Sequence, residues 1–257
     1  MVQYCKVLFG LVLLFFPNLL FSQKSDTVAK TFNFWGAITV TTKGISTFPN
    51  LTLGKPAAIF DLVAGNGRLS FEPTFRFSLE GKPWTFLFWG RYKAVQNDKF
   101  LLGVGLHPAF TFKTIHLVDN TGSSREFIRT QRYLAGELAP TWLLSKNVSL
   151  GLYYIYSRGL EKKEITKNSN FISLRSSISN IKLSENFFLK FAPQLYYLKM
   201  DRNDGFFANA TLTITRRNFP FSVSSTINQT IESTIPGEDF LWNINLIYSF
   251  GAKYRKL

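Results

Sequence analysis

The stretch "FLWNINLIYSF" at residues 240–250 decides the fold, because apolar and polar residues alternate along it. The polar parity includes Asn243, Asn245 and Ser249. The other parity holds only aromatic and aliphatic residues: Phe240, Trp242, Ile244, Leu246, Tyr248 and Phe250. Successive side chains of a β-strand point to opposite faces, so this stretch predicts a strand that separates an apolar medium from a polar one.

The same alternation recurs from Thr31 onward, and no long helical pattern interrupts it. The pattern predicts about twelve strands, an even number as in single-chain bacterial barrels, each long enough to cross a bilayer when tilted. The predicted strands cover residues 31–42, 55–63, 68–79, 83–94, 99–115, 125–143, 147–157, 169–178, 186–199, 205–216, 219–230 and 239–250.

Short and long connections mostly alternate between these strands. The short, turn-like connections are 64–67, 96–98, 145–147 and 217–218, and the longer polar ones are 116–124, 158–168 and 230–238. This is the pattern of a barrel with periplasmic turns at one end and outer loops at the other. The segment "EGKP" at 80–83 departs from it, as a short connection on the outer side.

A soluble barrel or sandwich would show the same alternation with its apolar face inside. Two features favour a membrane barrel instead. The polar parity consists mainly of Ser, Thr, Asn and Gly rather than Lys and Glu, and the aromatic residues gather toward strand ends, as an interfacial girdle does. We therefore predict an all-β fold, a closed antiparallel transmembrane β-barrel.

The N-terminus carries an export signal. Lys6 is followed by "VLFGLVLLFFPNLLFS" at 7–22, a short apolar core that Pro17 interrupts. This pattern predicts a cleaved signal peptide over 1–22 and an outer-membrane barrel over 23–257, and it favours this reading over an uncleaved anchor helix. Cys5 lies within the signal, so the mature chain would have no cysteine for disulfides or thiol catalysis.

The chain resembles bacterial outer-membrane β-barrel proteins of the Bacteroidota type in its signal ending "LLFSQ" and its aromatic-rich last strand. The segments "LTLGKPAAIFDL" and "LSFEPTFRFSLEGKPWTFLFWGRYK", within 51–93, resemble exported proteins of that group. The resemblance implies a barrel in the outer membrane and carries no known activity. One departure is that "GAKYRKL" follows Phe250, whereas such barrels often end on Phe.

Charged residues on the polar parity are expected to line the lumen. The predicted lumen cluster is Asp61, Glu72, Arg76, Arg91, Lys93, His107, Lys113, Glu137, Arg175 and Lys190. With Arg129 it holds seven bases and three acids, 7 − 3 = +4. An open lumen would then favour anions, which predicts a narrow channel or transporter for small anionic solutes. A plugged barrel that acts through its outer loops is the alternative.

Turn chemistry predicts how some of these residues face one another. An Asn-Gly turn at Asn66 and Gly67 would place Asp61 opposite Glu72, and closing the next hairpin across 80–83 would place Glu72 opposite Arg91. Such a row is either a constriction that grips a ligand or a salt-bridge network that fills the lumen.

A third hypothesis is an outer-membrane hydrolase acting on lipid, with His116 near Ser123 or Ser124. With two His residues and no mature Cys, no metal or cofactor is expected. The net charge of +14 is spread along the chain, which argues against nucleic acid and favours lipid and lipopolysaccharide as neighbours.

Four prolines lie inside predicted strands on the apolar parity, namely Pro73, Pro108, Pro140 and Pro193. Each lacks the N–H that a sheet ladder uses. We expect bulges or water-facing rims to accommodate them.

Overall fold

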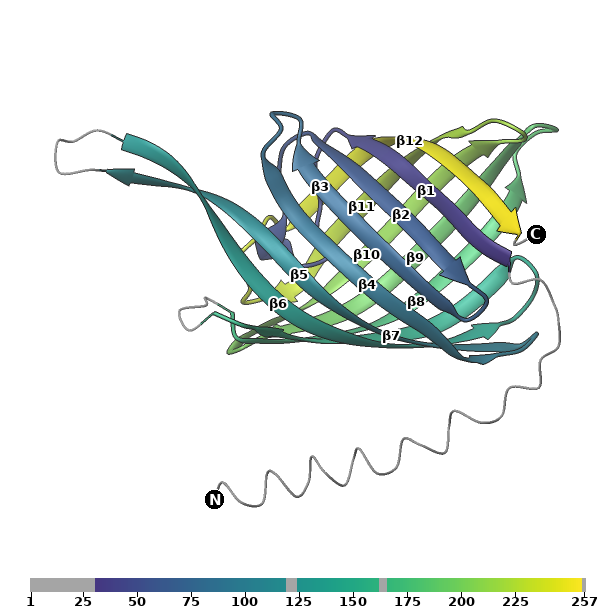
Figure 1. The fold of residues 1–257 in the computed structure, drawn as a ribbon, viewed down its shortest axis with the longest axis horizontal. Helices are drawn as coiled ribbons and strands as arrows, with labels where there is room; N and C mark the ends of the chain where they lie inside the picture. Colours follow the sequence, from purple (N-terminus) through teal and green to yellow (C-terminus); the bar gives the residue numbers. More distant parts are fainter. Residues whose placement is uncertain (1–30, 119–123, 162–165, 256–257) are drawn as a thin grey trace, which may run out of the picture. The chain divides into compact units, whose positions relative to one another are not determined.

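The computed structural model describes residues 31–118, 124–161 and 166–255, and these form a closed barrel of twelve antiparallel strands (Figure 1). The predicted fold class and strand number are confirmed. The strands are β1 (Thr31–Thr41), β2 (Ala57–Asn66), β3 (Leu69–Ser78), β4 (Pro83–Gln96), β5 (Phe100–Val118), β6 (Ser124–Leu143), β7 (Val148–Gly159), β8 (Asn168–Lys182), β9 (Phe187–Met200), β10 (Asn203–Arg216), β11 (Phe221–Ser233) and β12 (Phe240–Arg255).

The only helical element in the described part of the chain is the short 3-10 helix η2 (Pro49–Leu51). None of the described helices is long and apolar enough to span a membrane. The predicted signal peptide at 1–22 lies outside the described residues.

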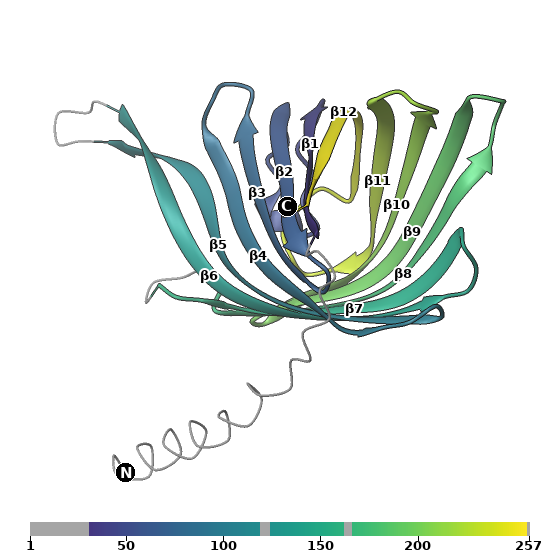
Figure 2. The ribbon, with the colours of Figure 1, turned by 45° about the vertical axis from the view of Figure 1, so that its right-hand side comes forward.

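Each strand pairs with its neighbours in sequence, and β12 returns to pair with β1 (Figure 2). The closing seam includes a hydrogen bond of 3.0 Å from the Thr42 N–H to the Ile244 carbonyl oxygen. We call the end where β1 begins and β12 ends the terminal end, and the opposite end the loop end. The connection of residues 42–56 between β1 and β2, the β1–β2 loop, lies at the loop end.

The two faces of β12 lie in different surroundings, as its alternating sequence predicts. Trp242, Ile244 and Leu246 are about half exposed on the outside of the barrel, whereas Asn243 and Asn245 are only 6% and 8% exposed. The Asn245 side-chain amide donates to the Ser224 hydroxyl at 3.0 Å and to the Asn243 side-chain oxygen at 3.2 Å. The polar residues therefore satisfy one another inside the barrel, and the apolar residues form its outer surface.

The predicted register of the first hairpins is wrong by two residues. Asn66 pairs with Leu69, so Gly67 and Arg68 form the turn and Asp61 lies opposite Thr74 instead of Glu72. Gly67 has a φ of 60°, a conformation that suits glycine. In the next hairpin Glu72 lies opposite Trp89, and Arg91 lies opposite Ser70.

Each strand proline lies where one of its two ladders is interrupted. The described β2–β3 register passes from Asp61 and Thr74 directly to Ala64 and Phe71, which leaves Pro73 in the gap. The other three prolines repeat this arrangement: Pro108 at the β4–β5 seam, Pro140 at the β6–β7 seam and Pro193 at the β8–β9 seam. The missing N–H groups thus fall where no pair is formed.

Candidate functional site

The β1–β2 loop turns into the barrel, and Figures 1 and 2 show η2 inside the ring of strands. The Trp84 indole N–H donates to the Leu51 carbonyl oxygen at 2.7 Å, and the Phe48 ring stacks against Phe171 of β8 at a centroid distance of 6.1 Å. The loop therefore makes specific contacts with both sides of the lumen. The sequence interpretation did not anticipate this, because residues 42–56 show no period that would reveal a docked face.

Trp84 departs from the alternation of its strand, because its sequence parity is that of Phe86 and Phe88, which would place it on the lipid face. The β3–β4 register passes from Arg76 and Thr85 to Phe77 and Pro83, so Trp84 is an extra residue in β4. This bulge turns its side chain inward, where it is 4% exposed.

Two ion pairs hold the ends of the β1–β2 loop. Lys43 Nζ lies 2.8 Å from Glu238 Oε2, and Lys55 Nζ lies 2.8 Å from Glu80 Oε2. The hydrogen bond from Lys55 lowers the pKa of the Glu80 carboxyl below its ordinary value. Both pairs are partly exposed, so they orient the loop more than they stabilise the barrel.

Below the loop, one arginine joins two acids along the lumen wall formed by β3, β4 and β6. The Arg91 guanidinium binds both carboxylate oxygens of Glu137, at 2.6 and 3.1 Å, and also pairs with Glu72. The Tyr153 hydroxyl donates to Glu137, and the Ser70 hydroxyl donates to Glu72 at 2.7 Å. We call these five residues the Arg91 network. Both carboxylates are paired and hydrogen-bonded there, as in a structural ion-pair network, and one arginine against two acids leaves the network with a net charge of 1 − 2 = −1.

Aromatic rings extend this network to the other predicted residues. The Arg91 guanidinium lies 4.5 Å from the centroid of Trp89, whose ring contacts that of His107 at 3.7 Å. The Arg175 guanidinium lies 4.3 Å from the Tyr153 centroid. Cation–π contacts hold both guanidinium groups over ring faces.

The remaining members of the predicted lumen cluster lie apart. The Thr74 hydroxyl donates to Asp61 at 2.7 Å, and Arg76 lies over Trp84 at 5.3 Å. Lys113 faces the β1–β2 loop, Lys190 lines a cavity nearer the terminal end, and Lys93 is exposed on β4.

The lumen also contains an apolar cluster that the sequence interpretation missed. Its buried members come from β8, β9, β10 and the β11–β12 connection: Phe171, Tyr196, Leu198, Met200, Phe207 and Ile235. Phe48, Tyr153 and Ile155 pack against it. Segments such as "QLYYLKM" at 194–200 are apolar on both parities, which hides the inward row from an alternation test.

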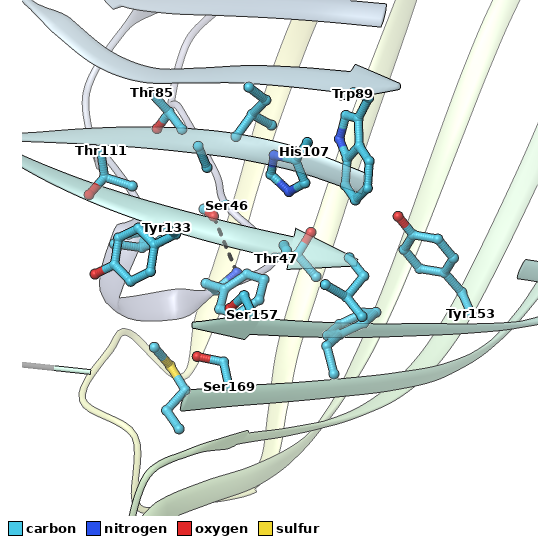
Figure 3. Close-up of a pocket in the computed structure, with 18 of the residues that line it drawn as sticks. Ser46, Thr47, Thr85, Trp89, His107, Thr111, Tyr133, Tyr153, Ser157 and Ser169 are labelled. Carbon is cyan, nitrogen blue, oxygen red and sulfur yellow. Dashed lines mark hydrogen bonds between the residues drawn. The ribbon is translucent and has the colours of Figure 1, made fainter. Parts of the chain in front are cut away.

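These groups enclose a cavity of about 310 Å³, the central cavity, between the β1–β2 loop and the Arg91 network. Figure 3 shows side chains of β4, β5, β7 and β8 around it, including Trp89, His107 and Tyr153, together with Ser46 and Thr47 of the loop. Arg175 also lines it. Its size and mixed lining are those of a small-molecule site.

The histidine of the hydrolase hypothesis lies on the β5–β6 hairpin. In the β5–β6 register His116 lies opposite Glu126, and Val118 lies opposite Ser124. Ser123 falls outside the described residues. No group of three or more metal-ligating side chains occurs in the part of the chain that the structure describes.

The barrel is similar to solved structures of bacterial outer-membrane proteins. The most informative match is the crystal structure of an outer membrane channel from Pseudomonas putida F1, with 10% sequence identity, 88% of this chain and 96% of that chain covered, and a TM-score of 0.52. This chain has the fold of an outer-membrane β-barrel.

Two further matches share the architecture more loosely. The KdgM porin in complex with disordered oligogalacturonate has 7% identity, coverage of 85% and 99%, and a TM-score of 0.49. The NanC porin has 11% identity, coverage of 86% and 100%, and a TM-score of 0.47. No protein-family model matches the sequence, and no curated protein does either.

Proposed function

We propose that this chain is an outer-membrane channel for small solutes with a preference for anions. In this proposal residues 1–22 are a cleaved signal peptide, residues 23–257 form the barrel, and the loop end faces outward toward lipopolysaccharide. The resemblance of residues 51–93 to exported Bacteroidota proteins agrees with this location. The outer-membrane fold supports a channel in general, and the charges that line the lumen support small anions as its solutes.

The observation that carries the proposal is a series of cavities that share lining residues from one end of the lumen toward the other. A vestibule of about 850 Å³ at the loop end shares Asn50 and Lys113 with a second cavity beside the β1–β2 loop. That cavity shares Thr85 with the central cavity. The central cavity shares Arg175 and Gln194 with a fourth, of about 330 Å³, toward the terminal end.

The distribution of ion pairs supports the anion preference. Glu72 and Glu137 are both bound by Arg91. Arg76, Arg175 and Lys190 also line the cavities, and none of them has an ion pair among the described residues. Arg91 offsets only one of its two carboxylates, so the Arg91 network and Asp61 keep two negative charges, against which stand Arg76, Lys113, Arg175 and Lys190. The balance is 4 − 2 = +2, which attracts anions.

The test is single-channel recording of the refolded mature chain in a planar bilayer under a KCl gradient. We expect steady openings with a reversal potential on the anion-selective side. Lys190→Gln should move the reversal potential toward zero, because it removes a positive charge from the path. Lys146→Gln, in an exposed turn at the terminal end, is the matched control and should leave it unchanged. A folded barrel that never opens would contradict the proposal.

The inserted β1–β2 loop favours one other function, a plugged barrel that acts through its outer loops. Replacing residues 46–52 with a Gly-Ser linker separates the two. If only the loop variant conducts, the loop is a plug; if both conduct and the variant conducts more, the loop is the constriction of a channel.

A further inference from the structure

The central cavity has an apolar wall suited to a hydrophobic ligand body. Phe171 is 1% exposed, and its ring packs against Phe48, Tyr153 and Tyr196 at centroid distances of 6.1, 6.1 and 5.2 Å. Trp89 lies on the β4 side of the same cavity. Hydrated ions would not be stabilised by these rings, since contact between water and apolar surface is unfavourable.

The same cavity carries a cation that no carboxylate of the described residues binds directly. Arg175 lies on the wall that the central cavity shares with the next cavity, and its guanidinium contacts the Tyr153 ring without an ion pair among the described residues. Arg91 differs, because Glu72 and Glu137 already neutralise it. A guanidinium that faces a cavity can bind a carboxylate through two parallel hydrogen bonds.

We propose that the central cavity binds a small amphiphilic carboxylate, with its carboxylate on Arg175 and its aromatic or aliphatic body between Phe48, Phe171 and Trp89. Arg76, which lines the cavity and has a buried Nε without a hydrogen bond, adds a second positive charge. The inference deepens the proposed function, since it names the solute class that the channel would select. A volume of about 310 Å³ limits the ligand to a short chain or a single ring.

The test is isothermal titration calorimetry of the refolded chain in nonionic micelles, with protein-free micelles as the blank. The probe is 4-phenylbutyrate. Two comparison compounds separate its parts, 4-phenylbutan-1-ol with the same body and no charge, and gluconate with the charge and a hydrophilic body. We expect 4-phenylbutyrate to bind about tenfold more tightly than either, the scale of one charge-assisted hydrogen bond.

Three variants locate the site. Arg175→Gln should weaken 4-phenylbutyrate about tenfold and leave 4-phenylbutan-1-ol unchanged. Phe48→Ala should weaken both compounds alike, and because Phe48 lies in the β1–β2 loop, this variant leaves the strands intact. Lys146→Gln is the matched control, a base in an exposed turn at the terminal end that does not line this cavity, and should change affinity less than about twofold.

Equal affinity for the three compounds would overturn the inference, and so would unchanged 4-phenylbutyrate binding in Arg175→Gln. Since binding is measured without current, the two proposals fail separately. A conducting barrel that does not bind the probe overturns only the carboxylate site. A silent barrel that binds it overturns the channel and leaves the site.

Discussion

At the scale of single residues, the Arg91 network depends on a missing side chain. The side chain of Glu137 is 3% exposed, so burying its charge is tolerated only because Arg91 binds both carboxylate oxygens and Tyr153 donates a further hydrogen bond. Gly105 lies directly opposite Glu137 on β5. A Cβ at Gly105 would lie 2.8 Å from Glu137 Oε1 and 2.9 Å from its Cγ, so the glycine makes room for the acid.

Gly105→Ala should therefore lower the free energy of unfolding by about 2 kcal/mol, the usual cost of overpacking. The Glu137 side chain cannot move aside without losing its bonds to Arg91. Gly103→Ala is the matched control two residues along the same strand, where a Cβ would sit 3.6 Å from the Ala139 Cβ in ordinary contact. Reversible guanidinium unfolding in lipid vesicles measures both. Equal decreases in the free energy of unfolding would show that the Glu137 side chain can move aside without cost, which would contradict the prediction.

At the scale of the strands, the hydrogen-bond ladders explain how the prolines are tolerated. Pro193 in β9 pairs with Ala210 of β10, while the β8–β9 register passes from Gln194 directly to Phe191. Leu195, two residues away on the same face, is paired with Leu174 and with Ala208. Residue 195 thus has a paired neighbour on β8, where a backbone N–H can be used in the ladder, whereas residue 193 has none.

Pro193→Ala should change the free energy of unfolding by no more than about 1 kcal/mol, because the new N–H enters an interrupted ladder and the remaining effect is on the unfolded chain. Leu195→Pro removes an N–H from a continuous ladder facing lipid, and should cost about 2 kcal/mol or more. The heat-dependent shift of the folded band on gels and unfolding in vesicles report both. A large loss in Pro193→Ala would show that the proline itself shapes the seam.

The strands and their faces could be predicted from the sequence because the period of two is carried by many residues. The register could not, because the turn uses Gly67 and Arg68 rather than Asn66 and Gly67. A shift of two residues keeps every side chain on its face. Glu72 and Arg91 therefore still share the lumen, and the long arginine side chain bridges the offset.

The parts of the site that could not be predicted depend on tertiary contacts. The docking of Phe48 on Phe171 joins residues far apart in sequence, in a loop without periodicity. Trp84 turns inward at a bulge that leaves no local signal in the sequence. The central cavity lies between the docked loop, which Trp84 holds through the Leu51 carbonyl, and the Arg91 network. Its walls therefore cannot be predicted from the strands taken one at a time.

At the scale of the whole barrel, the outer surface is the feature that distinguishes a membrane protein from a soluble one. Its strands expose large apolar residues over their length, among them Leu246 at 51% and Phe240 at 52%. In water such a surface would drive aggregation, whereas in a bilayer it is the stable arrangement. Phe240 begins β12 at the loop end, and Leu246 lies well inside the strand.

This depth difference gives a test of membrane insertion that does not depend on transport. Leu246→Arg should lower the free energy of unfolding in lipid vesicles by about 2–4 kcal/mol, because it places a charge near the middle of the hydrocarbon layer. Phe240→Arg, the matched control near the interface, should cost roughly 0–1 kcal/mol. A barrel whose outer face met water would tolerate both substitutions equally. Small and equal costs would therefore contradict the bilayer assignment, whereas a steep dependence on depth would place β12 across the membrane.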